Sequence, residues 1–253
     1  MEGRFLTDRG KVRNHNEDSG GIYFNADGQF LAIIADGMGG HKAGDVASQM
    51  AINHIQQKWE TCDQLSTPSR VESWLAETIE EMNQAIFDHA QAHDTCQGMG
   101  TTIVITVCTS KFFTVAHVGD SRCYLLNDNG LSQVTEDHSL VNALVKSGQV
   151  SKADARYHPQ KNVVLKAVGT EAQVEPDVQS LGWEQGDLLL LCSDGLTDKL
   201  TDEQLAAIMG KGESMVDTGQ QMIDTANNLG GEDNISLILI QHDVSTEDGE
   251  TTC

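Results

Sequence analysis

An apolar run that stops at a single carboxylate limits the folds open to this chain most strongly. Residues 31–41 read Leu-Ala-Ile-Ile-Ala-Asp-Gly-Met-Gly-Gly-His, so Asp36 follows five apolar residues and precedes a glycine-rich stretch. Such a run bounded by glycine predicts a buried β-strand with Asp36 held at its end. The glycines permit positive φ angles or a close approach of the backbone, so a carbonyl could join the carboxylate in holding a metal ion. Taken alone, an Asp-Gly pair after a strand is more often an ordinary turn.

The length and composition predict one large domain in a reducing compartment. A chain of 253 residues can bury a large core without disulfide bonds, and its three prolines form no linker that would divide it. We expect the domain to cover residues 1–243, followed by an acidic tail at 244–253. No run has signal-peptide character or reaches the roughly 20 apolar residues of a membrane span, which predicts a cytoplasmic protein without membrane insertion. The six cysteines lack zinc-like spacing, so reduced thiols are expected.

The charge of the chain excludes two classes of partner. With 16 basic and 38 acidic side chains, the formal net charge is -22 at pH 7. A surface this acidic repels the phosphates of nucleic acids and anionic lipids, so neither is expected as a partner. Much of the acid should be solvated, but a chain that concentrates carboxylates can also hold divalent cations.

Periodicity separates helices from strands along the rest of the chain. Helical spacing of apolar residues, a capping box at Thr201–Gln204 and a Gly-Gly stop predict helices at about 43–59, 71–93, 201–209 and 215–229. β-branched and aromatic residues predict a hairpin of 98–108 and 111–118 whose second arm ends in 119–126, and strands at 188–195 and 232–240. Residues 137–159 begin as a helix and become polar and charged, as in a mobile excursion from the core.

Four aspartates share one position relative to the predicted strands, because each lies at the end of a strand-like run. They are Asp36, Asp120, Asp194 and Asp233. If the sheets bring these ends together, repulsion prevents the carboxylates from sharing one cleft unless cations neutralise them. Ligation by oxygen alone selects Mg²⁺ or Mn²⁺ over zinc or copper. Two such ions can activate water for in-line attack on phosphorus, and phosphate monoesters need this help because they hydrolyse extremely slowly unaided.

Other polar residues allow two interpretations each. Arg13 and Asp18 are most simply members of a surface ion pair, but the planar fork of Arg13 suits a phosphate, and Asp18 can organise water around a metal. His89 and His93 have the spacing of two ligands on one helix face, yet no Glu accompanies them, which favours solvated histidines. His117 lies on a predicted strand, where a packed or hydrogen-bonded ring is favoured over a catalytic one.

Seven segments, taken together and in order, resemble the metal-dependent protein serine/threonine phosphatases of the PPM (type-2C) family, in its bacterial branch. They are Thr7–Asp18, Ala35–Gly44, Gly98–Thr102, Val118–Arg122, Asp137–Ser139, Cys192–Leu196 and Gly231–Ser236. The similarity extends from about Phe5 to His242 and is closest to the phosphatases that Gram-positive bacteria pair with a membrane serine/threonine kinase. It implies an α+β fold, a four-layer α-β-β-α sandwich of two antiparallel sheets flanked by helices, with the metals at one edge.

The resemblance also assigns the metal ligands. Asp36 would bridge two Mn²⁺ or Mg²⁺ ions and the Gly37 carbonyl would bind one of them. Asp194 and Asp233 would bind the other. Asp120, together with Asp194, would serve a weaker third metal. The catalytic carboxylates are therefore expected to be Asp36, Asp194 and Asp233.

Outside these ligands, the resemblance implies that Arg13 binds the substrate phosphate, that Asp18 holds metal-bound water, and that residues from about 146 to 161 form a flap that selects substrates. One position departs from the pattern of animal relatives. They carry a histidine directly after the Asp-Gly pair, proposed to protonate the leaving group, whereas this chain has Met38. His41 is nearby but belongs to the bacterial pattern, so the acid role is not transferred to it. A metal-bound water is the alternative proton donor.

The expected activity is hydrolysis of phosphoserine and phosphothreonine on proteins, in opposition to a serine/threonine kinase. Expected partners are phosphorylated proteins, including a cognate kinase, and we expect a monomer. One alternative is an inactive adaptor that binds phosphoproteins, which is disfavoured because every expected acidic ligand is present. Another is a phosphatase for the anti-anti-sigma proteins of stress or sporulation pathways. Those enzymes resemble this chain less around Arg13 and commonly carry a sensory domain.

Overall fold

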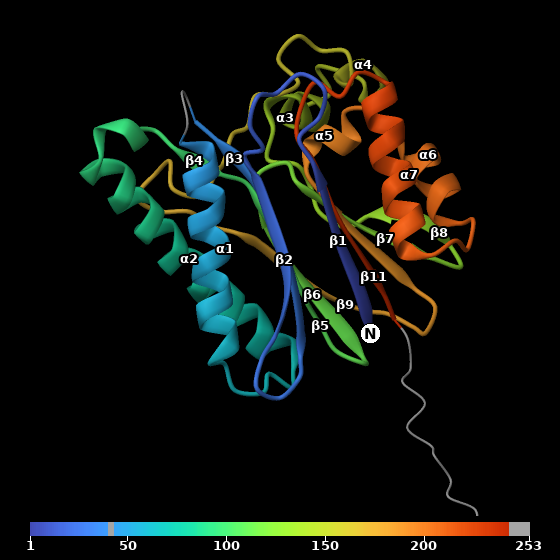
Figure 1. Cartoon of the computed structure of the whole chain (residues 1–253), viewed down its shortest axis with the longest axis horizontal. Helices are drawn as coiled ribbons and strands as arrows, with labels where there is room; N and C mark the ends of the chain where they lie inside the picture. Colours follow the sequence, from blue (N-terminus) through green and yellow to red (C-terminus); the bar gives the residue numbers. More distant parts are fainter. Residues whose placement is uncertain (40–42, 243–253) are drawn as a thin grey trace, which may run out of the picture.

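Two antiparallel β-sheets lie face to face between two pairs of helices (Figure 1). The structure is a computed structural model of the whole chain, and residues 1–39 and 43–242 of it are described. The predicted α+β sandwich is confirmed. His41 and the tail predicted at 244–253 lie outside the described residues. No helix of the described part is long and apolar enough to cross a membrane.

In the first sheet, the first strand of the chain pairs with the last described strand. Its strands, in spatial order, are β1 (Glu2–Asp8), β11 (Ile235–Gln241), β10 (Leu188–Cys192), β7 (Arg122–Asn127) and β8 (Gly130–Gln133). All neighbours pair antiparallel. Because β1 pairs with β11 from Glu2 opposite Gln241 to Asp8 opposite Ile235, the segments that follow β1 and precede β11 emerge at the same end of the sheet.

The second sheet contains the strand of the opening motif. Its order is β2 (Asp18–Phe24), β3 (Phe30–Met38), β5 (Ile103–Cys108), β6 (Phe112–Val118) and β9 (Asp177–Gly182), and β4 (Gly100–Thr101) pairs with the end of β3. β3 is buried on both faces. Leu31 and Ile33 face the helical layer, while Ala32 and Ile34 face the other sheet. This two-sided burial explains why the sequence there is a continuous apolar run and does not alternate.

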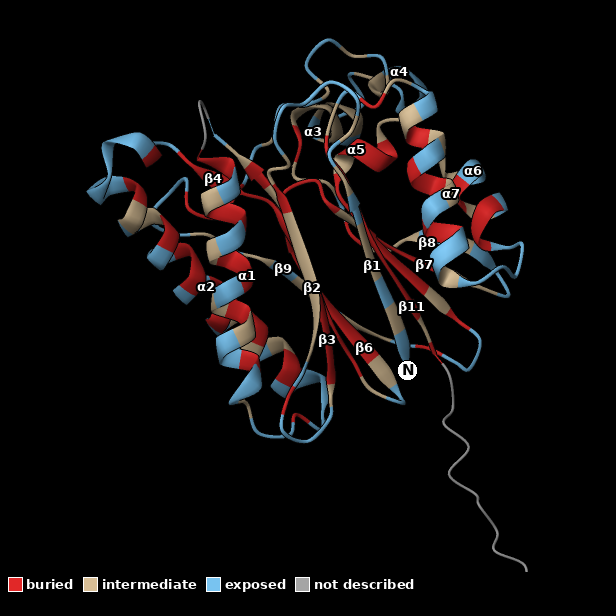
Figure 2. Ribbon diagram, viewed as in Figure 1, coloured by how far each residue is buried: buried red, intermediate tan, exposed pale blue. Residues whose placement is uncertain are grey.

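Helices cover the outer face of each sheet. On the second sheet they are α1 (Gly44–Glu60) and α2 (Pro68–Ala92), and on the first α6 (Asp202–Met209) and α7 (Met215–Asn228). Shorter helices are η1 (Asp94–Cys96), α3 (Leu140–Lys146), α4 (Lys152–Ala155) and α5 (Asp194–Thr197). Buried residues form three clusters, one between the sheets and one under each helical layer, as the red inner faces in Figure 2 show. Each fully buried large aliphatic side chain contributes about 1.5–3 kcal/mol to the core.

The four long helices, the capping box at Thr201 and the β5–β6 hairpin are confirmed. Strands β1, β2, β8 and β9 were not predicted. β2 contains Gly20 and Gly21, which have low strand propensity, and all four are edge strands with partly exposed faces, where the alternation of apolar residues is weak.

Several predicted strand boundaries need correction. The first hairpin arm begins at Ile103, because Gly100–Thr101 form β4 with the end of β3, while β10 ends at Cys192 and β11 begins at Ile235. Two further corrections concern the site. β3 does not end at Asp36 but continues to Met38, because Gly37 and Met38 pair with β4. The second hairpin arm does not continue to Leu126. β6 ends at Val118 in the second sheet and β7 begins at Arg122 in the first, so the chain crosses between sheets at residues 119–121. Asp120 lies in this crossing.

Candidate metal centre

The four aspartates singled out by their positions all line one cavity of about 220 Å³ at the edge where the sheets meet. Asp36 comes from β3 in the second sheet, and Asp120 from the crossing after β6. Asp194 is the first residue of α5, directly after β10, and Asp233 lies two residues before β11 in the first sheet. Both sheets therefore contribute acid to the same cavity. The remaining lining residues are Arg13, Glu17, Gly37, Met38, Gly39, Thr102, Asn162, Val164 and Asn234.

Asp18 lies beside this cavity and is not among the residues that line it. It is the first residue of β2 and pairs with Asp36 in the β2–β3 register. Ser193 Oγ donates a hydrogen bond to Asp18 Oδ2 at 2.8 Å, and the backbone N–H of Ser236 donates to Ser193 Oγ at 3.0 Å. Asp18 is thus held from the opposite sheet, by the residue directly before Asp194.

The carboxylates repel one another, so that burial and this repulsion together raise the pKa of Asp36 and Asp194. Burial, followed by repulsion from Asp18 and Asp194, raises the pKa of Asp36 well above its usual value. Burial, followed by repulsion from Asp120, does the same to the pKa of Asp194. Burial raises the pKa of Asp18 to about 6, and that of Asp120 to about 6. Ionisation of these carboxyl groups at neutral pH costs free energy, and a nearby cation would offset that cost.

Two buried carboxylate oxygens without hydrogen-bond partners are evidence for a cation site at this cavity. Among the described residues, Asp18 Oδ1 and Asp194 Oδ1 are buried without a hydrogen-bond partner. An unsatisfied buried carboxylate oxygen is costly, and it is a ready ligand for a metal ion or for water held by one. Because the acidic groups that converge on the cavity offer carboxylate oxygens, the set fits Mg²⁺ or Mn²⁺.

Arg13 brings a positive charge to the edge of the cavity. Its Nη2 donates to Asp233 Oδ2 at 2.7 Å, across 220 positions of sequence. The side chain is about half exposed (49%), and the hydrogen bond to Asp233 raises the pKa of the guanidinium. The ion pair of Arg13 is therefore with a residue distant in sequence, whereas the sequence favoured a pair with the nearby Glu17 and Asp18. The guanidinium reaches the acidic cluster and also faces solvent, as a phosphate ligand would need.

Both Asp-Gly pairs are explained by close packing of the backbone. A Cβ atom on Gly37 would lie 2.0 Å from the Gly44 carbonyl oxygen, and one on Gly195 would lie 1.9 Å from the Asn234 carbonyl oxygen. Neither glycine has a positive φ angle. Of the two reasons for glycine that the sequence left open, close approach is the one that applies.

Sequence reasoning assigned no role to Glu17, Thr102, Ser193 or Asn234. Thr102 donates its backbone N–H to the Asp36 carbonyl at 2.9 Å, and Glu17 lines the cavity. Ser193 and Asn234 are adjacent to the aspartates that were singled out, and this adjacency was the only available signal. Ser193 bonds to Asp18 and Ser236, 175 and 43 positions away, and the partners of the Asn234 side chain are 217 or more positions away, so the bonds themselves leave no local pattern.

A second cluster contains metal-type donors but is hydrogen-bonded in a way that opposes metal binding. Donor atoms of His117, His138 and Asp177 lie within 4.8 Å of one another. Gly119 N–H donates to His138 Nδ1 at 3.1 Å, so a neutral His138 carries its proton on Nε2 and has no lone pair there for a metal. His117 Nε2 lies 2.7 Å from the Glu136 carbonyl, and the two rings stack. His117 is packed and hydrogen-bonded, as the sequence predicted.

The other histidine pair that the sequence singled out also lacks the features of a metal site. His89 is partly buried and His93 is exposed at the end of α2, their rings stack at 4.1 Å, and His93 Nδ1 lies 2.9 Å from the His89 carbonyl. In the described part of the chain, no third metal-type donor is grouped with them.

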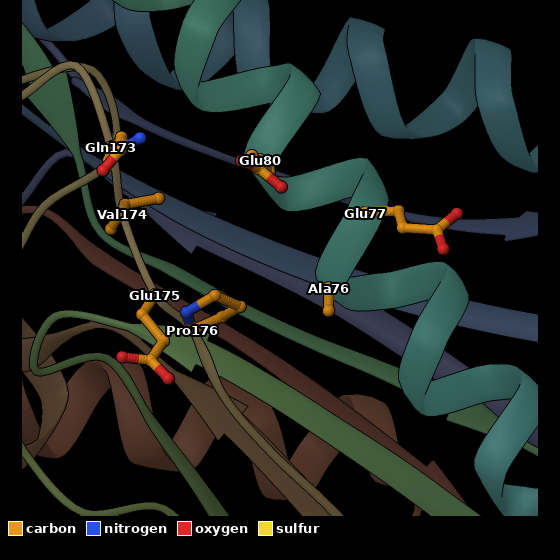
Figure 3. A pocket seen from close by; sticks show the side chains of 7 residues that line it. All are labelled: Ala76, Glu77, Glu80, Gln173, Val174, Glu175 and Pro176. Atoms are coloured by element: carbon orange, nitrogen blue, oxygen red, sulfur yellow. The ribbon is translucent and has the colours of Figure 1, made fainter.

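A larger cavity, of about 500 Å³, is a surface groove between α2 and residues 173–176. Figure 3 shows that the carboxylates of Glu77 and Glu175 point in different directions. Polar groups that do not converge cannot hold a reacting group. The smaller cavity, with its converging aspartates, is therefore the candidate site.

Comparison with known proteins agrees with this geometry. Residues 9–239 match the family described as Protein phosphatase 2C. The chain is 44% identical over 245 residues to "Serine/threonine phosphatase stp" of Listeria monocytogenes, covering 97% of each chain. Its structure is similar to that of the serine/threonine phosphatase Stp1 from Staphylococcus aureus, with a TM-score of 0.91, 38% identity, and coverage of 95% of this chain and 94% of that one.

A third similarity bears on the cation. The catalytic domain of the serine/threonine protein phosphatase PstP, in complex with two manganese ions, has a TM-score of 0.81 and 31% identity to this chain, and the match covers 94% of this chain and 96% of that one. The relatives are matched along almost their whole length, and the family match covers every aspartate of the cavity. On these grounds the chain belongs to the protein phosphatase 2C family.

Proposed function

We propose that this chain is a metal-dependent protein phosphatase that hydrolyses phosphoserine and phosphothreonine on proteins. The observation that carries the proposal is the convergence of Asp36, Asp120, Asp194 and Asp233 from two sheets on one cavity, with Arg13 at its edge. Membership of the family, and the names of relatives that match nearly the full chain, support the substrate class.

The residues present fit two Mn²⁺ or Mg²⁺ ions. Asp36 would contact both, the Gly37 carbonyl one of them, and Asp194 with Asp233 the other. Asp120 and Asp194 would hold a weaker third ion. When bound, the cations would supply an activated water and offset the charge that develops on the phosphate. The binding of two manganese ions by PstP supports this assignment.

The chain's own residues would orient the substrate. The Arg13 guanidinium can donate two parallel hydrogen bonds from its planar fork to two phosphate oxygens. Asp18, held by Ser193, would fix the orientation of water at the edge of the metal pair. Met38 lines the cavity and carries no titratable group, so the proton for the leaving group must come from elsewhere in the site, and a metal-bound water is our proposed source.

The proposal extends to partners. Phosphorylated proteins are the substrates, and a serine/threonine kinase with its targets is the natural source of them. We also propose that the phosphatase works as a monomer, because residues of a single chain line the whole cavity.

The decisive experiment measures phosphate release from a phosphothreonine peptide with Mn²⁺ and with a chelator, for the wild type and for Asp36→Asn. Release by the wild type should require Mn²⁺ and should fall by several orders of magnitude in the variant, since one bridging charge is lost. Circular dichroism of both proteins controls for folding. Release that does not depend on Mn²⁺, or that survives the substitution, would refute the proposed activity.

A further inference from the structure

One buried amide side chain, that of Asn234, holds both ends of the loop that carries Arg13. Asn234 is only 4% exposed. Its Nδ2 donates to the carbonyl oxygens of Arg9 at 2.8 Å and His15 at 2.9 Å. Its Oδ1 accepts a hydrogen bond from the backbone N–H of Glu17 at 2.8 Å. Arg13 lies between the anchored positions, four residues after the first and two before the second.

The chemistry of these three bonds requires an amide side chain. The amide faces two carbonyls with its NH₂ group and one N–H with its oxygen, so its partners fix its orientation. Aspartate has no donor, serine and threonine have one, and alanine or leucine has neither donor nor acceptor. Any of these would leave at least one of the three backbone groups without this partner.

Asn234 also connects this loop to a proposed metal ligand. Its backbone N–H donates to Asp233 Oδ1 at 2.9 Å, and Asp233 Oδ2 accepts the hydrogen bond from Arg13 at 2.7 Å. Asn234 therefore lies between the group that would bind phosphate and the carboxylate that would bind metal. The distance between these two groups decides whether one phosphate can contact both.

The loop has other attachments, which keep it in place but leave Arg13 free to shift. β1 remains paired with β11 up to Asp8, and Lys11 N–H donates to the Gly231 carbonyl at 2.7 Å. Within residues 13–16, no backbone group pairs with another backbone group in the described part of the chain. The Asn234 side chain holds the His15 carbonyl and the Glu17 N–H. Glu17 is also held through its carbonyl, which accepts hydrogen bonds from the Gly37 N–H at 3.1 Å and from Ser48 Oγ at 2.6 Å, so His15 is the anchor after Arg13 that depends on Asn234.

We propose that Asn234 is a positioning residue that sets where the Arg13 guanidinium stands relative to the metal-binding carboxylates, and thereby sets the efficiency with which phosphorylated substrate is used. This inference rests on the proposed function, because it takes Arg13 as the phosphate ligand. A guanidinium binds phosphate through two parallel hydrogen bonds, so a small displacement weakens it more than it would weaken a point charge.

The test compares Asn234→Ala with Asn25→Ala. Asn25 is also a buried asparagine (6% exposed) whose side chain makes three hydrogen bonds. It lies in the β2–β3 turn, at the opposite end of those strands from Asp36. Both substitutions should lower Tm. Only Asn234→Ala should lower kcat/KM for a phosphothreonine peptide, by roughly 10- to 100-fold at saturating Mn²⁺, because misplacement by about 1 Å can cost this much.

A double mutant separates positioning from general damage. If Asn234 acts through Arg13, then Asn234→Ala should change kcat/KM less than about twofold once Arg13→Ala is present. Mn²⁺ affinity, measured by calorimetry without substrate, should stay within about threefold of the wild type. An equal loss in both backgrounds, wild-type kcat/KM in Asn234→Ala, or a loss traced to Mn²⁺ affinity would each overturn the proposal.

A near-isosteric variant keeps the proposal testable if Asn234→Ala does not fold. Asn234→Asp keeps the acceptor for the Glu17 N–H and loses both donors, and the same double-mutant comparison applies to it. If this variant also fails to fold, Asn234 is a structural residue and the inference is wrong. A wild type without Mn²⁺-dependent release refutes the proposed function itself. An active wild type in which Asn234 and Arg13 act independently refutes only the positioning role.

Discussion

Glycine follows aspartate twice in this site because another backbone passes directly over it. At residue 37 the neighbour is the start of α1, and at residue 195 it is the carbonyl of Asn234, which precedes β11. The glycines therefore bring the segments of the site together, in addition to any ligand that their carbonyls provide. A sequence shows that glycine is present but not which segment requires it.

Substitution of Gly195 tests this steric role. Gly195→Ala places a Cβ 1.9 Å from the Asn234 carbonyl oxygen, so backbone must move. We expect the free energy of unfolding, measured by urea denaturation, to fall by about 1–3 kcal/mol. Gly182→Ala is the control, because its nearest contact would be 4.0 Å away. Equal stability of the two variants would contradict the steric explanation.

The source of the leaving-group proton is a second question at the scale of residues. Met38 lines the cavity, and His41 follows in the same motif. If a metal-bound water near Asp120 is the donor, kcat should be retained in His41→Ala and reduced at least about 100-fold in Asp120→Ala. The comparison uses a phosphopeptide at saturating Mn²⁺. The opposite pattern would assign the proton to His41 and end the water hypothesis.

At the scale of elements, the polar region after α3 is attached to the metal site through α5. Lys161 forms an ion pair with Asp198, and Arg156 Nη2 donates to the Thr197 carbonyl at 3.2 Å. Both partners belong to α5 or its C-terminal end, and α5 begins with Asp194. Asn162 and Val164, just beyond the predicted flap boundary, line the cavity.

This attachment predicts that substitution of Lys161 changes KM for one kind of substrate and not for another. Lys161→Met should cost less than about 1 kcal/mol of stability, because both partners of the pair are about one-third exposed. It should change KM several-fold for a phosphopeptide, which must contact the flap, and leave KM for p-nitrophenyl phosphate unchanged. Lys58→Met, which removes the more exposed pair with Glu81 far from the flap in sequence, is the control. Equal changes with both substrates would contradict a flap that selects proteins.

Elements could be predicted from the sequence where burial leaves a periodic pattern, as in α2, or a continuous apolar run, as in β3. β1, β2, β8 and β9 could not, because edge strands need less apolar character. At the site, Asp36, Asp120, Asp194 and Asp233 could be singled out by their place beside strands, and the structure shows that they line one cavity. The roles of Arg13 and Asp18 could be expected only from the family resemblance, and the contacts of Asn234 could be recognised only in the structure.

At the scale of the molecule, the buried acid couples folding to pH and metal. Folded Asp18 and Asp120 have a pKa of about 6, whereas an unfolded aspartate titrates near about 3.9. Between these values the metal-free folded state binds more protons than the unfolded state. Stability from these groups is therefore fully present below about pH 4 and is lost as the pH rises through about 6.

Cations take the place of these protons, which gives a prediction for thermal unfolding. Mn²⁺ should raise Tm more at about pH 7.5 than at about pH 5, because at the lower pH protons compete for the same oxygens. Calorimetry with Mn²⁺ and with a chelator at both values measures the difference. Asp36→Asn should reduce the rise at pH 7.5, as one shared ligand charge is missing. A rise that is independent of pH would contradict the coupling.

The pairing of β1 with β11 has a consequence for synthesis. Arg13 and Asp18 leave the ribosome early, whereas Asp233 and Asn234 directly precede the last described strand. Until that strand has emerged and paired with β1, a growing chain has neither the complete set of carboxylates nor a fixed Arg13 loop. A partly made chain would therefore be unable to remove phosphate from other proteins. Activity would begin only when β11 has paired with β1.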